Sequence, residues 1–113
     1  MSESADERTR RVLRENGLPE GLLPRDIVAA DISDSGAFSV QLARRVDRKH
    51  GPYPVRFHTR ISGVLAPGRV SQLRGVQAKQ LVWLTVNAIT ADADELIFTV
   101  GPAKRRLPRT AFP

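Results

Sequence analysis

Residues 55 to 62 read VRFHTRIS, and polar and apolar side chains alternate along this stretch without a break. Successive side chains of an extended chain point to opposite faces, so the alternation predicts a strand with one apolar face and one basic face. The apolar face holds Val55, Phe57, Thr59 and Ile61, and the other face holds Arg56, His58, Arg60 and Ser62. The function of the domain depends on what this Arg-His-Arg stripe contacts.

Shorter segments of the same kind lie on both sides of this strand. Further strands are predicted from alternating or apolar runs between turn residues, at 27–32, 37–42, 69–73 and 95–100. Residues 81–89, LVWLTVNAI, are apolar on both faces and indicate the central strand. We interpret 44–54 as a loop rich in charge, Gly and Pro. Gly63 is interpreted as a bulge or bend, Gly75 as a break and the tail after 100 as irregular, with Phe112 free to dock.

The N-terminal part predicts the helical element. Ser4 and Glu7 have the spacing of a capping box, so a helix is expected over 5–16, ending at Asn16-Gly17. Residues 18–25 contain LPEGLLP, whose prolines and glycine prevent regular structure while its leucines favour burial, so this corner should fix the helix to the body. The prediction is a single domain over 1–113 with its β body at 27–113. The fold class is mainly β, an antiparallel, partly open β-barrel or sandwich of about six or seven short strands with one N-terminal α-helix.

Composition limits the function classes. The chain has 113 residues, 41% of them hydrophobic, and no cysteine, which excludes disulfides, thiolate zinc sites and cysteine nucleophiles. The N-terminus is charged throughout and no apolar run approaches the ~20 residues of a membrane span, so we expect a soluble, cytoplasmic protein without a transmembrane segment. The oligomeric state stays open.

Charge is distributed unevenly. The formal net charge is +6, and residues 48–91 contain no Asp or Glu. A second basic cluster lies near the C-terminus, at residues 104–109. Such a field attracts phosphate, carboxylate or an anionic surface, although a positive balance also serves solubility alone.

Several stretches, in this order and spacing, resemble the domain of unknown function 538 family, which is best known from plants. They are GLPEGLLP, GAFSVQL, ISGVLAPGRVSQLRGVQAKQLVWLTVNAI, ELIFTVG and the closing proline and phenylalanine. The resemblance runs from about Val12 to Phe112 and implies a small, mostly β, barrel-like fold similar to the lipid-binding domains of bactericidal permeability-increasing proteins. It implies binding of lipid or lipopolysaccharide, a role in stress response, or an esterase activity, and carries no catalytic motif onto named residues.

Hydrolysis would need a nucleophile, a base and an orienting group that converge. The two histidines are His50, in the basic loop, and His58, on the stripe. Ser62 shares the face of His58, but four strand residues span ~13 Å, beyond hydrogen-bond reach. Imidazole is a common catalytic base, so a weak carboxylesterase that uses His58 is an alternative. Two separated histidines without cysteine give no metal site, and no cofactor is expected.

Nucleic-acid binding is a further alternative because of the charge, as is a protein-interaction module. Aromatic residues make up only 5% of the chain, and the alternation assigns most of them to the core, whereas base stacking needs exposed rings. Nucleic acid is therefore the less favoured partner.

The sequence thus favours a non-enzymatic domain that binds an anionic lipid-like or amphiphilic ligand, or an anionic lipid surface. The core is either closed or leaves room for one acyl chain. Basic side chains of the stripe would hold the anionic group by charge-assisted hydrogen bonds. The candidate ligand-binding residues are Arg56, His58, Arg60, Lys79 and Trp83.

Overall fold

The helix forms where the capping residues predict it. The computed structural model describes residues 3–25, 27–50, 53–79 and 81–112. Helix α1 (Ala5–Glu15) starts at Ser4, whose Oγ accepts a hydrogen bond from the Glu7 N–H at 3.1 Å and donates one to Glu7 Oε1 at 3.2 Å. Gly17 follows the helix with φ +75°, a left-handed conformation that glycine adopts without strain. The predicted helix is confirmed, with its last residue one position earlier.

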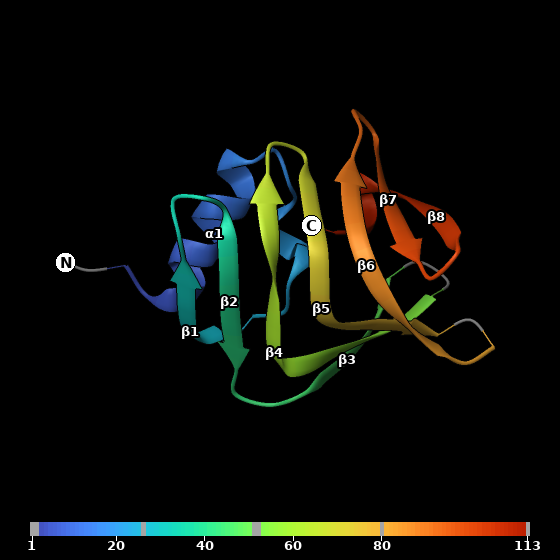
Figure 1. Cartoon of the computed structure of the whole chain (residues 1–113), viewed down its shortest axis with the longest axis horizontal. Helices are drawn as coiled ribbons and strands as arrows, with labels where there is room; N and C mark the ends of the chain where they lie inside the picture. Colours follow the sequence, from blue (N-terminus) through green and yellow to red (C-terminus); the bar gives the residue numbers. More distant parts are fainter. Residues whose placement is uncertain (1–2, 26, 51–52, 80, 113) are drawn as a thin grey trace.

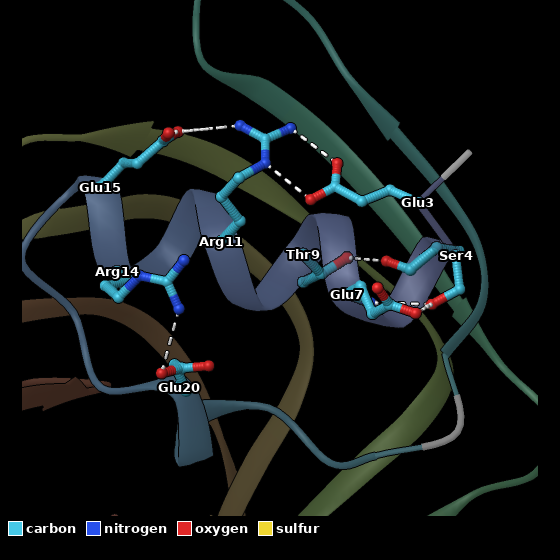
Figure 2. A network of polar contacts seen from close by, with 9 residues as sticks. Glu3, Ser4, Glu7, Thr9, Arg11, Arg14, Glu15 and Glu20 are labelled. Atoms are coloured by element: carbon cyan, nitrogen blue, oxygen red, sulfur yellow. Dashed lines mark hydrogen bonds and ion pairs between the residues drawn. The ribbon is translucent and has the colours of Figure 1, made fainter. Parts of the chain in front are cut away.

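On the exposed face of α1, Arg11 forms ion pairs with one residue before the helix and with the last residue of the helix (Figure 2). The guanidinium of Arg11 donates to both carboxylate oxygens of Glu3, at 2.8 and 2.9 Å, and also to Glu15. These hydrogen bonds from Arg11 hold the pKa of the Glu3 carboxyl below its ordinary value. The N-terminal segment is therefore tied to the middle of the helix.

The corner after the helix buries its leucines as predicted, but the expectation that it has no regular structure is wrong. It contains a short 3-10 helix, η1 (Glu20–Leu22), and buries Leu18, Leu22 and Leu23. Arg10 of α1 reaches across and donates hydrogen bonds to backbone carbonyls of this corner. Corner and helix are thus joined by apolar burial and by one buried side chain.

Within the described residues, eight strands form one antiparallel sheet that does not close into a barrel (Figure 1). They are β1 (Ile27–Ile32), β2 (Ala37–Leu42), β3 (Val46–His50), β4 (Tyr53–Ala66), β5 (Arg69–Lys79), β6 (Trp83–Ala91), β7 (Glu95–Val100) and β8 (Ala103–Pro108). The order is β1-β2-β4-β5-β6-β7-β8, and β3 pairs with β4 alone. A second 3-10 helix, η2 (Arg109–Ala111), follows β8. The predicted fold class, mainly β with one N-terminal helix, is confirmed.

The long strand β4 bends in its middle, and each half has its own partner on one edge. Residues 53–57 pair with β3, whereas 60–64 pair with β2. The pairing of β4 with β5 shifts register between Phe57 and Ser62, and Thr59 is exposed. The prediction that Thr59 lies on the buried face is wrong, because the bend interrupts the alternation there. The register shifts again next to Gly63, as its prediction as a bulge requires.

Three other expectations from the sequence are wrong. Strand β5 continues through Gly75, which has φ +91° and no side chain to meet the carbonyl of Arg60. The expected loop at 44–54 contains β3, and the expected irregular tail contains β8. Phe112 is docked as foreseen, with its ring stacked on Phe98 at 5.5 Å between centroids. Both missed strands are polar, so apolar periodicity did not indicate them.

The core lies between the sheet and the α1–η1 segment, with α1 against one face of the sheet (Figure 1). Leu13 and Leu22 from that segment and Val40 and Val76 from the sheet line the same interior space. This cavity has a volume of ≈ 20 Å³, and a water needs roughly 10–15 Å³. Of the two outcomes considered, the closed core is the one observed.

Candidate binding surface on the outer face

The Arg-His-Arg stripe lies on the outer face of β4, and the bend divides it. Val55, Phe57 and Ile61 are buried on the opposite face. In register, Arg56 lies between Asp47 of β3 and Gln77 of β5, whereas Arg60 lies beside Gln41 of β2. The two arginines therefore belong to different halves of the sheet.

Arg56 is held in place by two neighbours on the outer face. Its Nε donates a hydrogen bond to Asp47 Oδ1 at 3.0 Å, and its Cζ lies 4.1 Å from the centroid of the Trp83 ring. At that distance the guanidinium is attracted to the face of the indole by a cation–π interaction. Arg56 thus joins β3, β4 and β6 on this face, and its side chain remains 24% exposed.

His58 contacts an amide. Its Nε2 lies 2.9 Å from Oε1 of Gln77, an oxygen that accepts a hydrogen bond when Nε2 carries the proton. None of the hydrogen bonds of His58 in the described part of the chain goes to a serine hydroxyl. The structure therefore brings His58 and Gln77 together.

Arg60 borders a separate, shallow hollow of ≈ 160 Å³ between β1, β2 and β4. Asp31 and Ser39 line the same hollow. The carboxylate of Asp31 opposes an anionic ligand there. Arg60 is therefore not brought together with Arg56 in one anion site.

Lys79 and Trp83 face each other across the end of the β5–β6 hairpin. The two apolar side chains described between them are exposed, Leu81 at 96% and Val82 at 61%. We call Lys79, Leu81, Val82 and Trp83 the hairpin tip; the β5–β6 end of the sheet lies at the lower right of Figure 1. Leu81 was expected in the central strand, and that expectation is wrong because the strand starts at Trp83.

A further lysine, Lys49, lies near this end of the sheet. Lys49 of β3 pairs with Pro54, which precedes Val55, and Val55 pairs with Ala78 next to Lys79. Within the described residues, Lys49 and Lys79 form no ion pair. The apolar tip is thus accompanied by uncompensated positive charge.

Sequence reasoning missed the tip because its turn lacks the usual turn residues. Residues 79–83 read KQLVW, without Gly, Pro, Asn or Asp. Exposed Leu81 and Val82 therefore looked like the beginning of a buried strand. The sequence analysis named Lys79 as a candidate ligand-binding residue, but it did not predict that the neighbouring Leu81 and Val82 are exposed.

A metal site and a membrane-spanning helix each have structural requirements with which the described residues can be compared. No group of three or more His, Asp or Glu side chains gathers there to hold a metal ion. The same part of the chain contains no helix that is both long enough and apolar enough to cross a bilayer.

Comparison with known proteins decides the family. The model of a family described as "Protein of unknown function, DUF538" matches residues 9–113. The chain belongs to the DUF538 family. This DUF538 chain is also similar to a protein of Arabidopsis thaliana named "Uncharacterized protein At5g01610", with 27% identity over 97 residues. The match covers 84% of this chain and 57% of that protein, so the chain spans little more than half of its relative.

The fold comparison foreseen from the resemblance is not tested. No solved structure matches the chain significantly. The similarity to the lipid-binding domains of bactericidal permeability-increasing proteins therefore stays a prediction.

Proposed function

We propose that this DUF538 chain binds anionic lipid surfaces reversibly, through the hairpin tip. The observation that carries the proposal is the exposure of Leu81 and Val82 next to Lys79. Apolar side chains that enter the acyl boundary while lysines remain at the headgroups are typical of peripheral membrane contacts. Trp83 adds an amphipathic ring at the same level.

Magnitudes favour reversible contact. Full burial of a Leu or Val side chain contributes ~1.5–3 kcal/mol, and each lysine near an anionic leaflet contributes ~1 kcal/mol. Two apolar and two basic side chains, Lys49 and Lys79, give a gross attraction of several kcal/mol, part of which offsets the entropy lost on docking. Binding should therefore be weak, dependent on anionic lipid and sensitive to salt.

The closed core supports a surface contact over an enclosed ligand. An interior space of ≈ 20 Å³ holds about one water and has no room for an acyl chain. Of the residues proposed for the ligand, Lys79 and Trp83 belong to the tip and Arg56 orients Trp83. His58 and Arg60 lie further along β4 and have no direct part in this contact.

Co-sedimentation with vesicles tests the proposal. Wild-type protein should bind vesicles of phosphatidylserine and phosphatidylcholine, and bind pure phosphatidylcholine much less. Leu81→Ser and Val82→Ser should each weaken binding roughly tenfold, because each removes an inserted apolar side chain. Lys79→Glu should also weaken vesicle binding, and the loss should be larger at low salt than at high salt.

Val28→Ser is the matched control, because Val28 on β1 is 58% exposed and lies outside the tip. It should bind vesicles as the wild type does. Equal losses in Val28→Ser and Val82→Ser, or no dependence on phosphatidylserine, would refute the proposal.

Two alternative activities are kept apart by the same variants. A weak esterase would hydrolyse p-nitrophenyl esters and lose that activity in His58→Ala, while vesicle binding stayed unchanged. A nucleic-acid module would bind RNA with steep salt dependence and be insensitive to Leu81→Ser. Burial of Phe38, Phe57 and Phe98 gives bases few rings on which to stack.

A further inference from the structure

A second hollow, unrelated to the hairpin tip, lies between the start of the chain and β3. Its volume is ≈ 420 Å³, and it opens between α1, the corner at 18–25 and the β3 strand. It is lined by Arg10, Glu20, Gly21, Leu23, Pro24, Arg25, Val46 and Arg48. Three of these side chains are guanidinium groups, contributed by three separate segments. We call this hollow the arginine pocket.

Arg10 supplies a fixed charge to the arginine pocket. It is buried, and its two Nη atoms donate to the carbonyls of Glu20, Leu23 and Pro24 and to Asp6 Oδ1, the last at 3.0 Å. Its Nε is buried and has no hydrogen-bond partner. A buried, partnerless donor is costly, and here it belongs to a side chain that lines the pocket.

Within the described residues, Arg25 and Arg48 form no ion pair with an acidic side chain. Asp26 is not among the described residues. Partial burial lowers the pKa of Arg48, and the charges of Arg10 and Arg25 lower it further. The acidic residue that lines the pocket, Glu20, is paired with Arg14 at 3.4 Å. The walls thus bring together like charges that repel each other and that a bound anion would stabilise.

We infer that the arginine pocket binds a small molecule that carries a phosphate group. Guanidinium groups match phosphate oxygens with paired, charge-assisted hydrogen bonds, and several of them suit a dianion better than a monoanion. The volume lies within the roughly 300–1,000 Å³ that is usual for small-molecule sites, so there is room for more than the phosphate itself. This site is independent of the proposed contact with lipid surfaces.

Isothermal titration calorimetry with inorganic phosphate, glycerol 3-phosphate and acetate tests the inference. All titrations are made at one ionic strength set with chloride, so that general screening is constant. Both phosphates should bind saturably, glycerol 3-phosphate the more tightly, and acetate should bind much more weakly. Arg48→Gln and Arg25→Gln should each weaken phosphate binding roughly tenfold or more, as loss of a charge-assisted hydrogen bond predicts.

Arg44→Gln is the matched control, because Arg44 is exposed near β3 and lies outside the pocket while the charge removed is the same. It should leave phosphate binding within about twofold of the wild type. Phosphate should also raise the midpoint of thermal unfolding of wild type and Arg44→Gln, and should raise that of Arg48→Gln clearly less at the same phosphate concentration. Equal losses in Arg44→Gln and Arg48→Gln, or no saturable phosphate binding, would overturn the inference.

Discussion

The guanidinium of Arg56 covers the indole of Trp83, with Cζ 4.1 Å from the ring centroid, while its Nε donates to Asp47. The two residues lie on β4 and β6, with β5 between them. This contact orients the aromatic ring at the hairpin tip. It also means that Arg56, which the sequence analysis proposed as a ligand-binding residue, already interacts with Trp83 and Asp47. Arg56 is therefore best understood as a positioning residue for Trp83.

A double-mutant cycle measures that contact. Arg56→Gln and Trp83→Leu, alone and together, should show a coupling of about 0.5–1 kcal/mol in the free energy of urea unfolding, the range of a partly exposed cation–π pair. Arg60→Gln with Trp83→Leu is the control cycle and should be additive, because Arg60 lies on the other half of the sheet. Additivity in the Arg56 cycle would mean that the stacked geometry does not contribute to stability.

Gly75 allows β4 and β5 to approach each other at the bend. A Cβ at this position would lie 2.2 Å from the carbonyl oxygen of Arg60, and the backbone has φ +91°. Gly75→Ala should therefore lower the free energy of unfolding by about 3 kcal/mol or more, through both steric overlap and backbone strain.

Gly17→Ala separates the two contributions. Gly17 also has a positive φ, +75°, but nothing lies within 4 Å of its hypothetical Cβ. It should cost only about 1–2 kcal/mol, the penalty for the left-handed conformation alone. If Gly75→Ala and Gly17→Ala lower the free energy of unfolding equally, β4 and β5 can move apart at Gly75 with little loss of stability.

Local signals account for what the sequence predicts correctly. Ser4 and Glu7 begin the helix through hydrogen bonds within one turn, and the burial of Val55, Phe57 and Ile61 follows from alternation in one strand. The missed strands β3 and β8 are polar and pair with β4 or β7 alone, so backbone pairing forms them without a hydrophobic pattern. Period-two alternation cannot indicate such edge strands.

The sites depend still more on tertiary structure. The candidate residues Lys79 and Trp83 are four positions apart in the sequence, and the structure pairs them across the β5–β6 hairpin. Their surroundings differ from expectation because a hairpin turn without turn residues exposes Leu81. The arginine pocket combines Arg10, Arg25 and Arg48 from three segments, and no spacing in the chain indicates their convergence.

Arg10 gives the last test, of the connection between helix and corner. Arg10→Met keeps much of the apolar volume but removes the hydrogen bonds to three carbonyls and to Asp6. The carbonyls would need water or remain unsatisfied, so the free energy of urea unfolding should fall by about 3 kcal/mol. Arg14 also lies in α1, but it is exposed and is paired with Glu20 of the corner. Arg14→Met should change the free energy of urea unfolding by less than about 1 kcal/mol. If both variants unfold alike, apolar burial of Leu18, Leu22 and Leu23 alone holds the corner in place.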